Sequence, residues 1–105
     1  MTHTEQQIQR VILDYLAIVA KQRPIYYFRS AAGSVKTETG RFFKTGRPGC
    51  PDLSLIIDGR YHGIEVKTEK GRQSPAQKQA EQEIIAAGGQ YHLVRCLDDV
   101  KRILA

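Results

Sequence analysis

The strongest constraint on this chain is a predicted hairpin centred on Asp58-Gly59. Segments rich in Leu, Ile and Val lie on either side of that pair, over Leu53–Ile57 and Arg60–Lys67. Asp-Gly between two such segments is typical of a type I′ turn with two residues at its tip. A turn of fixed length also fixes which residues face each other across the two strands. Here it places Leu53 opposite Ile64.

The same register brings two carboxylates together. One step further from the turn, Asp52 lies opposite Glu65, where facing Cβ atoms are ~4.5–5.5 Å apart and like charges destabilise the pair. A divalent cation is the simplest reason for such an arrangement, because hard carboxylate oxygens suit Mg²⁺ or Mn²⁺. Strand alternation adds Lys67 to the face that carries Glu65.

Asp52, Glu65 and Lys67 together favour phosphodiester hydrolysis. An ion held by two carboxylates can polarise a phosphoryl oxygen and orient an attacking water. A lysine beside the ion can help to deprotonate or position that water and can stabilise the charge of the transition state. An exposed hairpin with ordinary surface charges is the alternative interpretation.

An amphipathic helix is predicted from about Thr4 to Lys21. Its apolar residues recur every three or four positions, as one buried helical face requires. They are Ile8, Val11, Ile12, Tyr15, Leu16 and Val19. Glu5 lies on the same side, where its carboxylate could complete a metal site or take part in a capping box. That box would pair Thr2 with Glu5 or Thr4 with Gln7.

A second helix is predicted to begin at Ser74-Pro75-Ala76-Gln77 and to run to about Ala87. Ser74 suits the N-cap, proline suits the first helical position, and Gln77 completes a capping box. Gly88-Gly89 then ends the helix. Gln77 also aligns with the inward side of this helix, so it could support the site as well as cap the helix.

The remaining segments complete an α/β domain that spans residues 1–105. Short strands are predicted over Ile25–Arg29 and Gln90–Arg95, and a final helix over Asp98–Leu104. Residues 30–51 are rich in Gly, Ser, Thr and basic side chains and are predicted to form a long loop. The resulting order, α-β-β-β-α-β-α, predicts a mixed sheet flanked by helices.

The charge of the chain favours a polyanionic partner. Lys and Arg number 16 against 11 acidic residues, a net charge of +5 at pH 7. The excess gathers in the predicted loop, and we expect its basic residues to contact DNA phosphates; they are Arg29, Lys36, Arg41, Lys44 and Arg47. A solvated loop with no partner is the alternative.

Several classes of protein are excluded by the sequence. Cys50 and Cys96 form no CxxC or Cys/His cluster with zinc spacing, and we expect both thiols to be reduced. No apolar run approaches the ~18 residues of a membrane span, and the first residues do not resemble a signal peptide. We therefore expect an intracellular protein, in the cytoplasm or associated with the nucleoid, encoded by a microbe, a phage or a mobile element.

Three motifs, taken in order, resemble the PD-(D/E)XK nuclease superfamily and, more closely, its VRR-NUC branch. They are Gly49-Cys50-Pro51-Asp52-Leu53, then Glu65-Val66-Lys67, then Ser74-Pro75-Ala76-Gln77. The resemblance runs from Glu5 to Gln77. It implies a restriction-endonuclease-like α-β-β-β-α-β core, which agrees with the predicted order of elements.

The resemblance also implies a role for each matching residue. Asp52 and Glu65 would be catalytic ligands of Mg²⁺ or Mn²⁺, joined by the main-chain carbonyl oxygen of Val66. Lys67 would be the catalytic lysine. Glu5 would be a further metal-binding carboxylate from the first helix, and Gln77 a supporting residue of the catalytic site from the second helix.

The substrate is expected to be branched DNA. Stand-alone members of the VRR-NUC branch resemble homodimeric endonucleases that act on four-way (Holliday) junctions, and we expect this protein to be a stand-alone member. A homodimer would place two active sites on a two-fold symmetric junction. The alternatives are a flap or single-strand endonuclease, a nuclease subunit of a larger complex, and a non-catalytic DNA-binding module.

Overall fold

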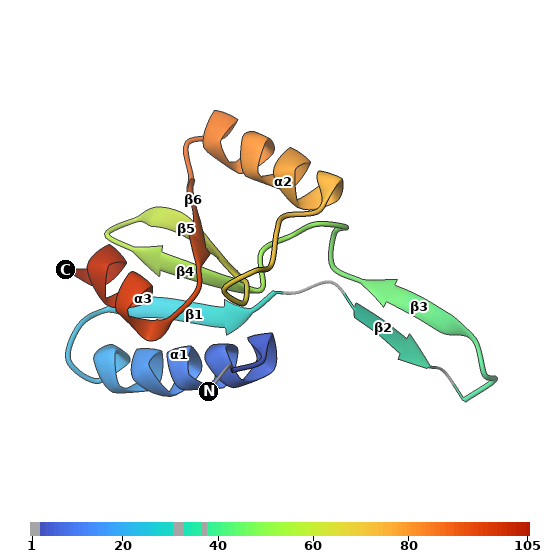
Figure 1. The fold of residues 1–105 in the computed structure, drawn as a ribbon, viewed down its shortest axis with the longest axis horizontal. Coiled ribbons are helices and arrows are strands. Elements are labelled where there is room, and N and C mark those ends of the chain that lie inside the picture. Colours follow the sequence, from blue (N-terminus) through green and yellow to red (C-terminus); the bar gives the residue numbers. More distant parts are fainter. Residues whose placement is uncertain (1–2, 31–32, 37) are drawn as a thin grey trace.

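The computed structural model describes residues 3–30, 33–36 and 38–105, without the side chains of residues 33–36 and 42–45. Within these residues, a four-stranded sheet lies between helices on both faces (Figure 1). The strands, in spatial order, are β1 (Ile25–Arg29), β4 (Leu53–Ile57), β5 (Arg60–Val66) and β6 (Gln90–Val94). β4 is antiparallel to both β1 and β5, and β6 is parallel to β5. The predicted mixed α/β sheet is therefore confirmed.

The central hairpin has the predicted register. Leu53 faces Ile64 across β4 and β5, and Leu55 faces His62. The turn residues Asp58 and Gly59 have φ angles of 53° and 77°, the left-handed conformation that a type I′ turn needs at both positions. Turn chemistry thus fixes the alignment of the two strands that carry the candidate site.

The helix α1 (Glu5–Ala20) lies on one face of the sheet. Its capping box pairs Thr4 with Gln7, which is one of the two predicted starts. Ile12 and Leu16 are fully buried, but the prediction that Val11 belongs to the buried face is wrong, because Val11 is 48% exposed. It lies at the margin of the helix face that the sheet covers.

Two further helices follow the predicted signals. The helix α2 (Pro75–Ala86) covers the other face of the sheet and begins with the predicted capping box of Ser74 and Gln77. The helix α3 (Leu97–Leu104) packs beside α1. The core lies between the sheet and the helices α1 and α3. Its buried members are Ile12, Leu16, Leu53, Leu55, Ile57, Ile64, Val66, Val94, Val100 and Leu104.

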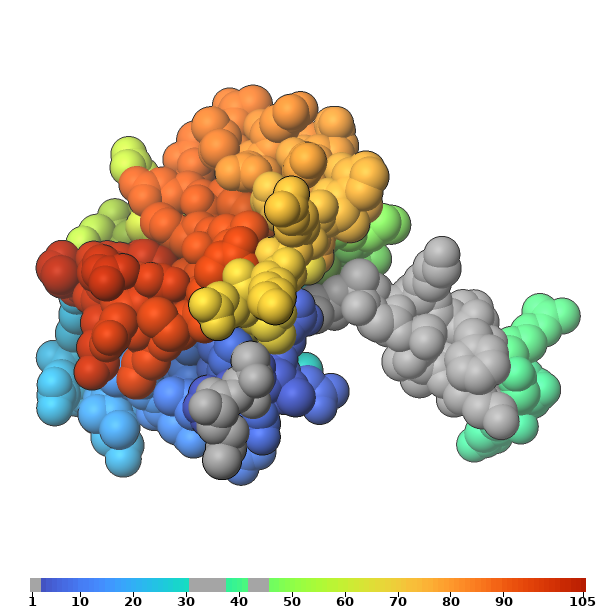
Figure 2. Space-filling view, in the orientation of Figure 1, coloured from blue at the N-terminus to red at the C-terminus, as the bar shows by residue number. Residues whose placement is uncertain are grey.

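The prediction that residues 30–51 form one long loop is wrong in part. It contains a second hairpin of β2 (Gly33–Lys36) and β3 (Phe42–Thr45), which form a separate antiparallel sheet. This arm projects from the body (Figure 1), and its tip at residues 38–41 stands well apart from it (Figure 2). Its two strands are short, and their sequences carry no alternation of apolar and polar residues, by which strands are recognised in a sequence.

No helix among the described residues is both long and apolar enough to cross a membrane. Cys50 and Cys96 are both free thiols, as expected.

Candidate active site

The predicted carboxylate pair forms at the end of the central hairpin. Asp52 is the residue before β4 and is partly buried, whereas Glu65 lies in β5 and is only 2% exposed. When Glu65 carries a proton, its carboxyl group can donate a hydrogen bond to Asp52. Oδ2 of Asp52 also accepts a hydrogen bond of 2.8 Å from the main-chain N–H of Val66. The Asp52 carboxylate is thus held against the end of β5.

Glu65 carries the largest electrostatic cost in the site. Burial, the hydrogen bond to Asp52 and the charge of Asp52, in order of decreasing effect, raise its pKa to about 9. The charge of Lys67 acts in the opposite direction with a smaller effect, and the charge of Glu5 adds slightly to the increase. Asp52, Lys67 and Glu5 are therefore all close enough to act on Glu65, and the sequence had grouped these same residues.

The chemistry of these residues fits a divalent cation. Oε1 of Glu65 is buried and has no hydrogen-bond partner, which is costly for a carboxylate unless a cation or a donor satisfies it. Among the described residues, no three side chains of His, Cys, Asp or Glu gather into a metal site by themselves. A bound ion would therefore need main-chain or water oxygens in addition, and the carbonyl of Val66 is the predicted one.

Lys67 and Gln77 lie on different elements. Lys67 directly follows β5, is partly buried, and donates its main-chain N–H to the carbonyl of Val94 over 3.0 Å. Gln77 stands in the first turn of α2, where its Oε1 accepts a hydrogen bond of 2.8 Å from the N–H of Ser74. The capping role of Gln77 is thus confirmed, and its support of the site stays a prediction.

Ser30 fixes the segment that carries Asp52, and the sequence gave no sign of this role. Its main-chain N–H donates to the carbonyl of Asp52 over 2.9 Å, and its hydroxyl donates to the carbonyl of Pro51 over 2.8 Å. The thiol of Cys50 and the hydroxyl of Ser54 donate to Ser30 in turn. Ser30 follows β1 and is far from Asp52 in the chain, so no local pattern could reveal these contacts.

The glycine and proline before Asp52 have packing roles. Gly49 has a φ of 78°, and a Cβ atom there would lie 2.2 Å from the carbonyl oxygen of Ala76 at the start of α2. Pro51 packs over Gly63, where a Cβ atom would lie 2.5 Å from the proline ring. The first and third sequence motifs are therefore in direct contact, and this contact sets α2 against the carboxylate-bearing strands.

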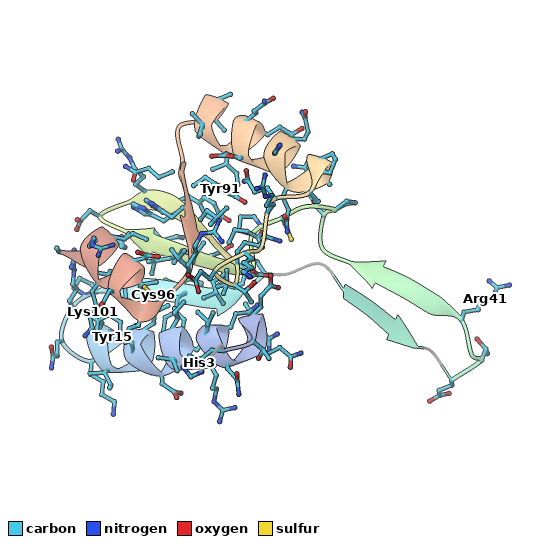
Figure 3. The ribbon with its side chains drawn as sticks, viewed as in Figure 1. His3, Tyr15, Arg41, Tyr91, Cys96 and Lys101 are labelled. Carbon is cyan, nitrogen blue, oxygen red and sulfur yellow. The ribbon has the colours of Figure 1, made fainter. Side chains whose placement is uncertain are left out.

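A polar network beside the carboxylates was not predicted. Tyr91 of β6 lies between the sheet and α2 (Figure 3). Gln73 donates hydrogen bonds of 3.1 Å to the Tyr91 hydroxyl and 3.0 Å to Oε1 of Glu81. The pKa of Tyr91 is raised to about 12, mainly by burial; the hydrogen bond from Gln73 acts against this, and the charges of Glu65, Glu81 and Asp52 contribute to the increase. The network thus joins the segment after β5 to both α2 and β6.

The predicted DNA-binding residues do not form one cluster. Arg29 ends β1 beside the site, whereas Arg41 lies at the tip of the arm and extends away from the body (Figure 3). Arg47 forms an ion pair of 3.2 Å with Glu83 of α2. The side chains of Lys36 and Lys44 lie outside the described part of the structure.

Comparison with known proteins agrees with the motifs at the level of the fold. No protein-family model matches the sequence, and no curated protein matches it. Two solved structures do match. A VRR_NUC domain is 20% identical with a TM-score of 0.63, over 97% of this chain and 96% of that one. A VRR_NUC domain protein is 22% identical with a TM-score of 0.68, over 99% of this chain and 87% of that one. This chain therefore has the fold of VRR_NUC domains.

Proposed function

We propose that this protein is a divalent-metal-dependent endonuclease of the PD-(D/E)XK type, that it belongs to the VRR-NUC family, and that it hydrolyses phosphodiester bonds in branched DNA. Its substrate would be the four-way junction, cut by a homodimer. One observation carries the proposal: Asp52 and Glu65 lie together at the end of the central hairpin, with Lys67 beside them, within the fold of VRR_NUC domains.

The acidic residues would hold the metal ion. Asp52, Glu65 and the carbonyl of Val66 are the proposed ligands, and Glu5 would add a further carboxylate from α1. A bound Mg²⁺ or Mn²⁺ would supply Lewis-acid polarisation of the phosphoryl oxygen and charge neutralisation. The buried Oε1 of Glu65, which lacks a hydrogen-bond partner, supports this assignment.

The other residues of the site would position the water and the substrate. Lys67, fixed by its main-chain bond to Val94, would hold the attacking water and stabilise the negative charge that develops on the phosphate. The hydrogen bond from Val66 keeps Asp52 oriented before any ligand binds, which lowers the cost of ordering the site. Gln77 would support this arrangement from the first turn of α2.

An exposed apolar patch supports the homodimer. Tyr26, Phe28 and Ile56 are 65%, 47% and 42% exposed, and they lie on the sheet face that α2 covers only in part. The rings of Tyr26 and Phe28 are 6.0 Å apart between centroids. A second copy of the chain would cover this patch, and light scattering of the free protein measures the resulting mass directly.

Cleavage of labelled synthetic DNA tests the proposal. A four-way junction, a matched flap and a matched duplex are each incubated with Mg²⁺, Mn²⁺ or EDTA. The variant Lys67→Ala removes the proposed catalytic lysine, and Lys70→Ala removes an exposed lysine three residues away as a matched control. We expect paired symmetric nicks in the junction that require the metal and Lys67, and we expect Lys70→Ala to cut normally.

The other outcomes contradict defined parts of the proposal. Cleavage of the flap alone would contradict the junction as substrate but leave the catalytic site in place. Equal cleavage by the wild type and Lys67→Ala would contradict the catalytic role of the lysine. DNA binding without cleavage of any substrate would favour a non-catalytic binding module.

A further inference from the structure

A polar cavity lies between α1 and the end of β1. It has a volume of about 300 Å³ and is lined by Gln6, Gln9, Arg10, Leu13 and Arg29. On α1, Gln9 and Arg10 lie three and four positions after Gln6, and Leu13 lies four and three positions after them. These residues therefore form one stripe of the helix surface. Two guanidinium groups and two carboxamides therefore border one hollow, with a single apolar residue among them.

The two arginines of this cavity form no strong ion pair within the described part of the protein. Arg10 approaches Asp14 at 3.8 Å, and both side chains are largely exposed (81% and 72%), so this ion pair contributes little. Among the described residues, no carboxylate forms an ion pair with Arg29. Both guanidinium groups are thus available to an anion, which they can bind with two parallel hydrogen bonds each.

Gln9 gives an independent sign that the cavity takes a polar ligand. Its side chain is 9% exposed, and its buried Oε1 has no hydrogen-bond partner. Buried carboxamides nearly always have partners in folded proteins. A bound polar group with its water molecules would complete the hydrogen bonding of Gln9.

The cavity lies next to the acidic site. Arg29 faces Leu53, the residue after Asp52, and the following residue, Ser30, is hydrogen-bonded to Asp52. On α1, Gln9 comes one helical turn after Glu5. A DNA strand that approaches this site meets the acidic side chains of Glu5 and Asp52. Positively charged side chains near the site are needed to hold the phosphates of this strand in place.

We infer that this cavity, which we call the Arg10/Arg29 pocket, binds a phosphodiester group of the strand being cut, one that neighbours the scissile phosphate. The inference rests on the proposed nuclease function and adds a specific phosphate subsite to it. Arg10 and Arg29 would bind the phosphate oxygens, and Gln6 and Gln9 would complete the contacts directly or through water. The pocket would fix the register of the strand at the carboxylates, because phosphate contacts position a protein along DNA.

DNA binding without metal tests the pocket. Affinity for the labelled four-way junction is measured in EDTA over a range of salt concentrations. Arg10→Gln/Arg29→Gln is compared with Lys21→Gln/Arg60→Gln, which removes the same charge from exposed positions elsewhere. Each phosphate contact contributes about 0.9 to the slope of log K against log salt. We expect the pocket variant to lower this slope by about 1 more than the control variant.

A series of junctions with a single methylphosphonate then locates the contact. Wild-type binding should weaken at one internal position near the cut, and the pocket variant should show no additional loss at that position. Equal slopes for the two variants would overturn the inference, and so would a pocket variant that keeps the wild-type sensitivity at every position. Sensitivity only to removal of a 5′-terminal phosphate would overturn the assignment to an internal phosphodiester.

Cleavage in Mg²⁺, measured in parallel, separates the pocket from the proposed function. Wild-type protein that shows the expected binding pattern but cuts nothing would refute the nuclease and support the pocket. Wild-type protein that cuts the junction, with pocket variants that match the control variant, would refute the pocket alone.

Discussion

Glu65 is destabilising in the metal-free protein. The folded protein keeps a proton on this carboxyl up to about pH 9, whereas an ordinary glutamate loses it near 4.5. The free energy of unfolding therefore falls as the pH rises through this window, because the folded state binds more protons there. A buried group with such a cost is expected where function requires it.

Replacing Glu65 by glutamine should stabilise the protein without metal. Glu65→Gln keeps the shape and removes the charge, so we expect the free energy of unfolding to rise by about 1–3 kcal/mol at pH 7 in EDTA. Urea unfolding measures this change. The gain should vanish at pH 4, and Glu69→Gln, at an exposed position, should change nothing. A less stable Glu65→Gln at pH 7 would contradict the prediction.

A substitution of Gly49 tests the contact between the segment before β4 and the start of α2. Gly49→Ala introduces a left-handed alanine and a Cβ atom 2.2 Å from a main-chain oxygen of α2. We expect a loss of about 3 kcal/mol in urea unfolding. Gly59→Ala is the matched control, because its φ is 77° with nothing within 4 Å of the new Cβ, and it should cost only about 1 kcal/mol. Equal losses would show that the contact with α2 is unimportant.

The sequence revealed the site where its geometry is local. Asp58-Gly59 fixes the register of the hairpin, and the register alone brings Asp52 to Glu65. Ser30 and Tyr91 escaped prediction because they reach the site through pairing with strands distant in the chain. Serine and tyrosine are also common on any surface, so neither residue type marks such a role.

At the scale of elements, a histidine pair links β5 to β6. Nδ1 of His62 and Nε2 of His92 are 3.0 Å apart, and the rings stack with centroids 5.3 Å apart. Burial lowers the pKa of both side chains. Arg60 lowers the pKa of His62 further, Asp58 acts against this, and His62 lowers that of His92. A hydrogen bond between two rings requires that one ring nitrogen be unprotonated.

This pair predicts a loss of stability in mild acid. The unfolded chain takes up protons near pH 6.5, before the folded protein does, so stability is fully present above that pH and falls below it. Glu65 changes stability in the opposite direction over this range, so urea unfolding of the Glu65→Gln variant between pH 7.5 and 5 isolates the loss. The partial solvent exposure of His92 should keep the loss below about 1.4 kcal/mol per pH unit for each histidine. His92→Asn should flatten this dependence, and His3→Gln should not. An unchanged slope in His92→Asn would exclude the pair as its cause.

The arm is where prediction from the sequence failed. β4 and β5 are apolar because they fill the core, and this made them recognisable. β2 and β3 form a sheet of their own, and their short sequences have no alternation of apolar and polar residues by which a strand could be recognised.

At the scale of the whole molecule, the net charge of +5 contrasts with an acidic site. Asp52 and Glu5 would repel a phosphodiester chain, so the basic residues around the site must hold it. These residues divide into the Arg10/Arg29 pocket on the body and Arg41, Lys44 and Arg47 on and beside the arm. DNA that bridges the two groups would contact phosphates at several points, and its affinity would depend steeply on salt.

Removing the positive charges on and beside the arm should therefore weaken DNA binding and make the affinity depend less steeply on salt. Arg41→Gln/Lys44→Gln/Arg47→Gln removes up to three phosphate contacts, so we expect the slope of log K against log salt to fall by about 2–3. The control, Lys21→Gln/Arg60→Gln/Arg102→Gln, removes the same charge and includes Arg102, which is paired with Asp99 as Arg47 is with Glu83. Fluorescence anisotropy of a labelled four-way junction measures both slopes. If the arm variant and the control give the same slope, DNA does not contact the arm, and net charge alone accounts for the binding.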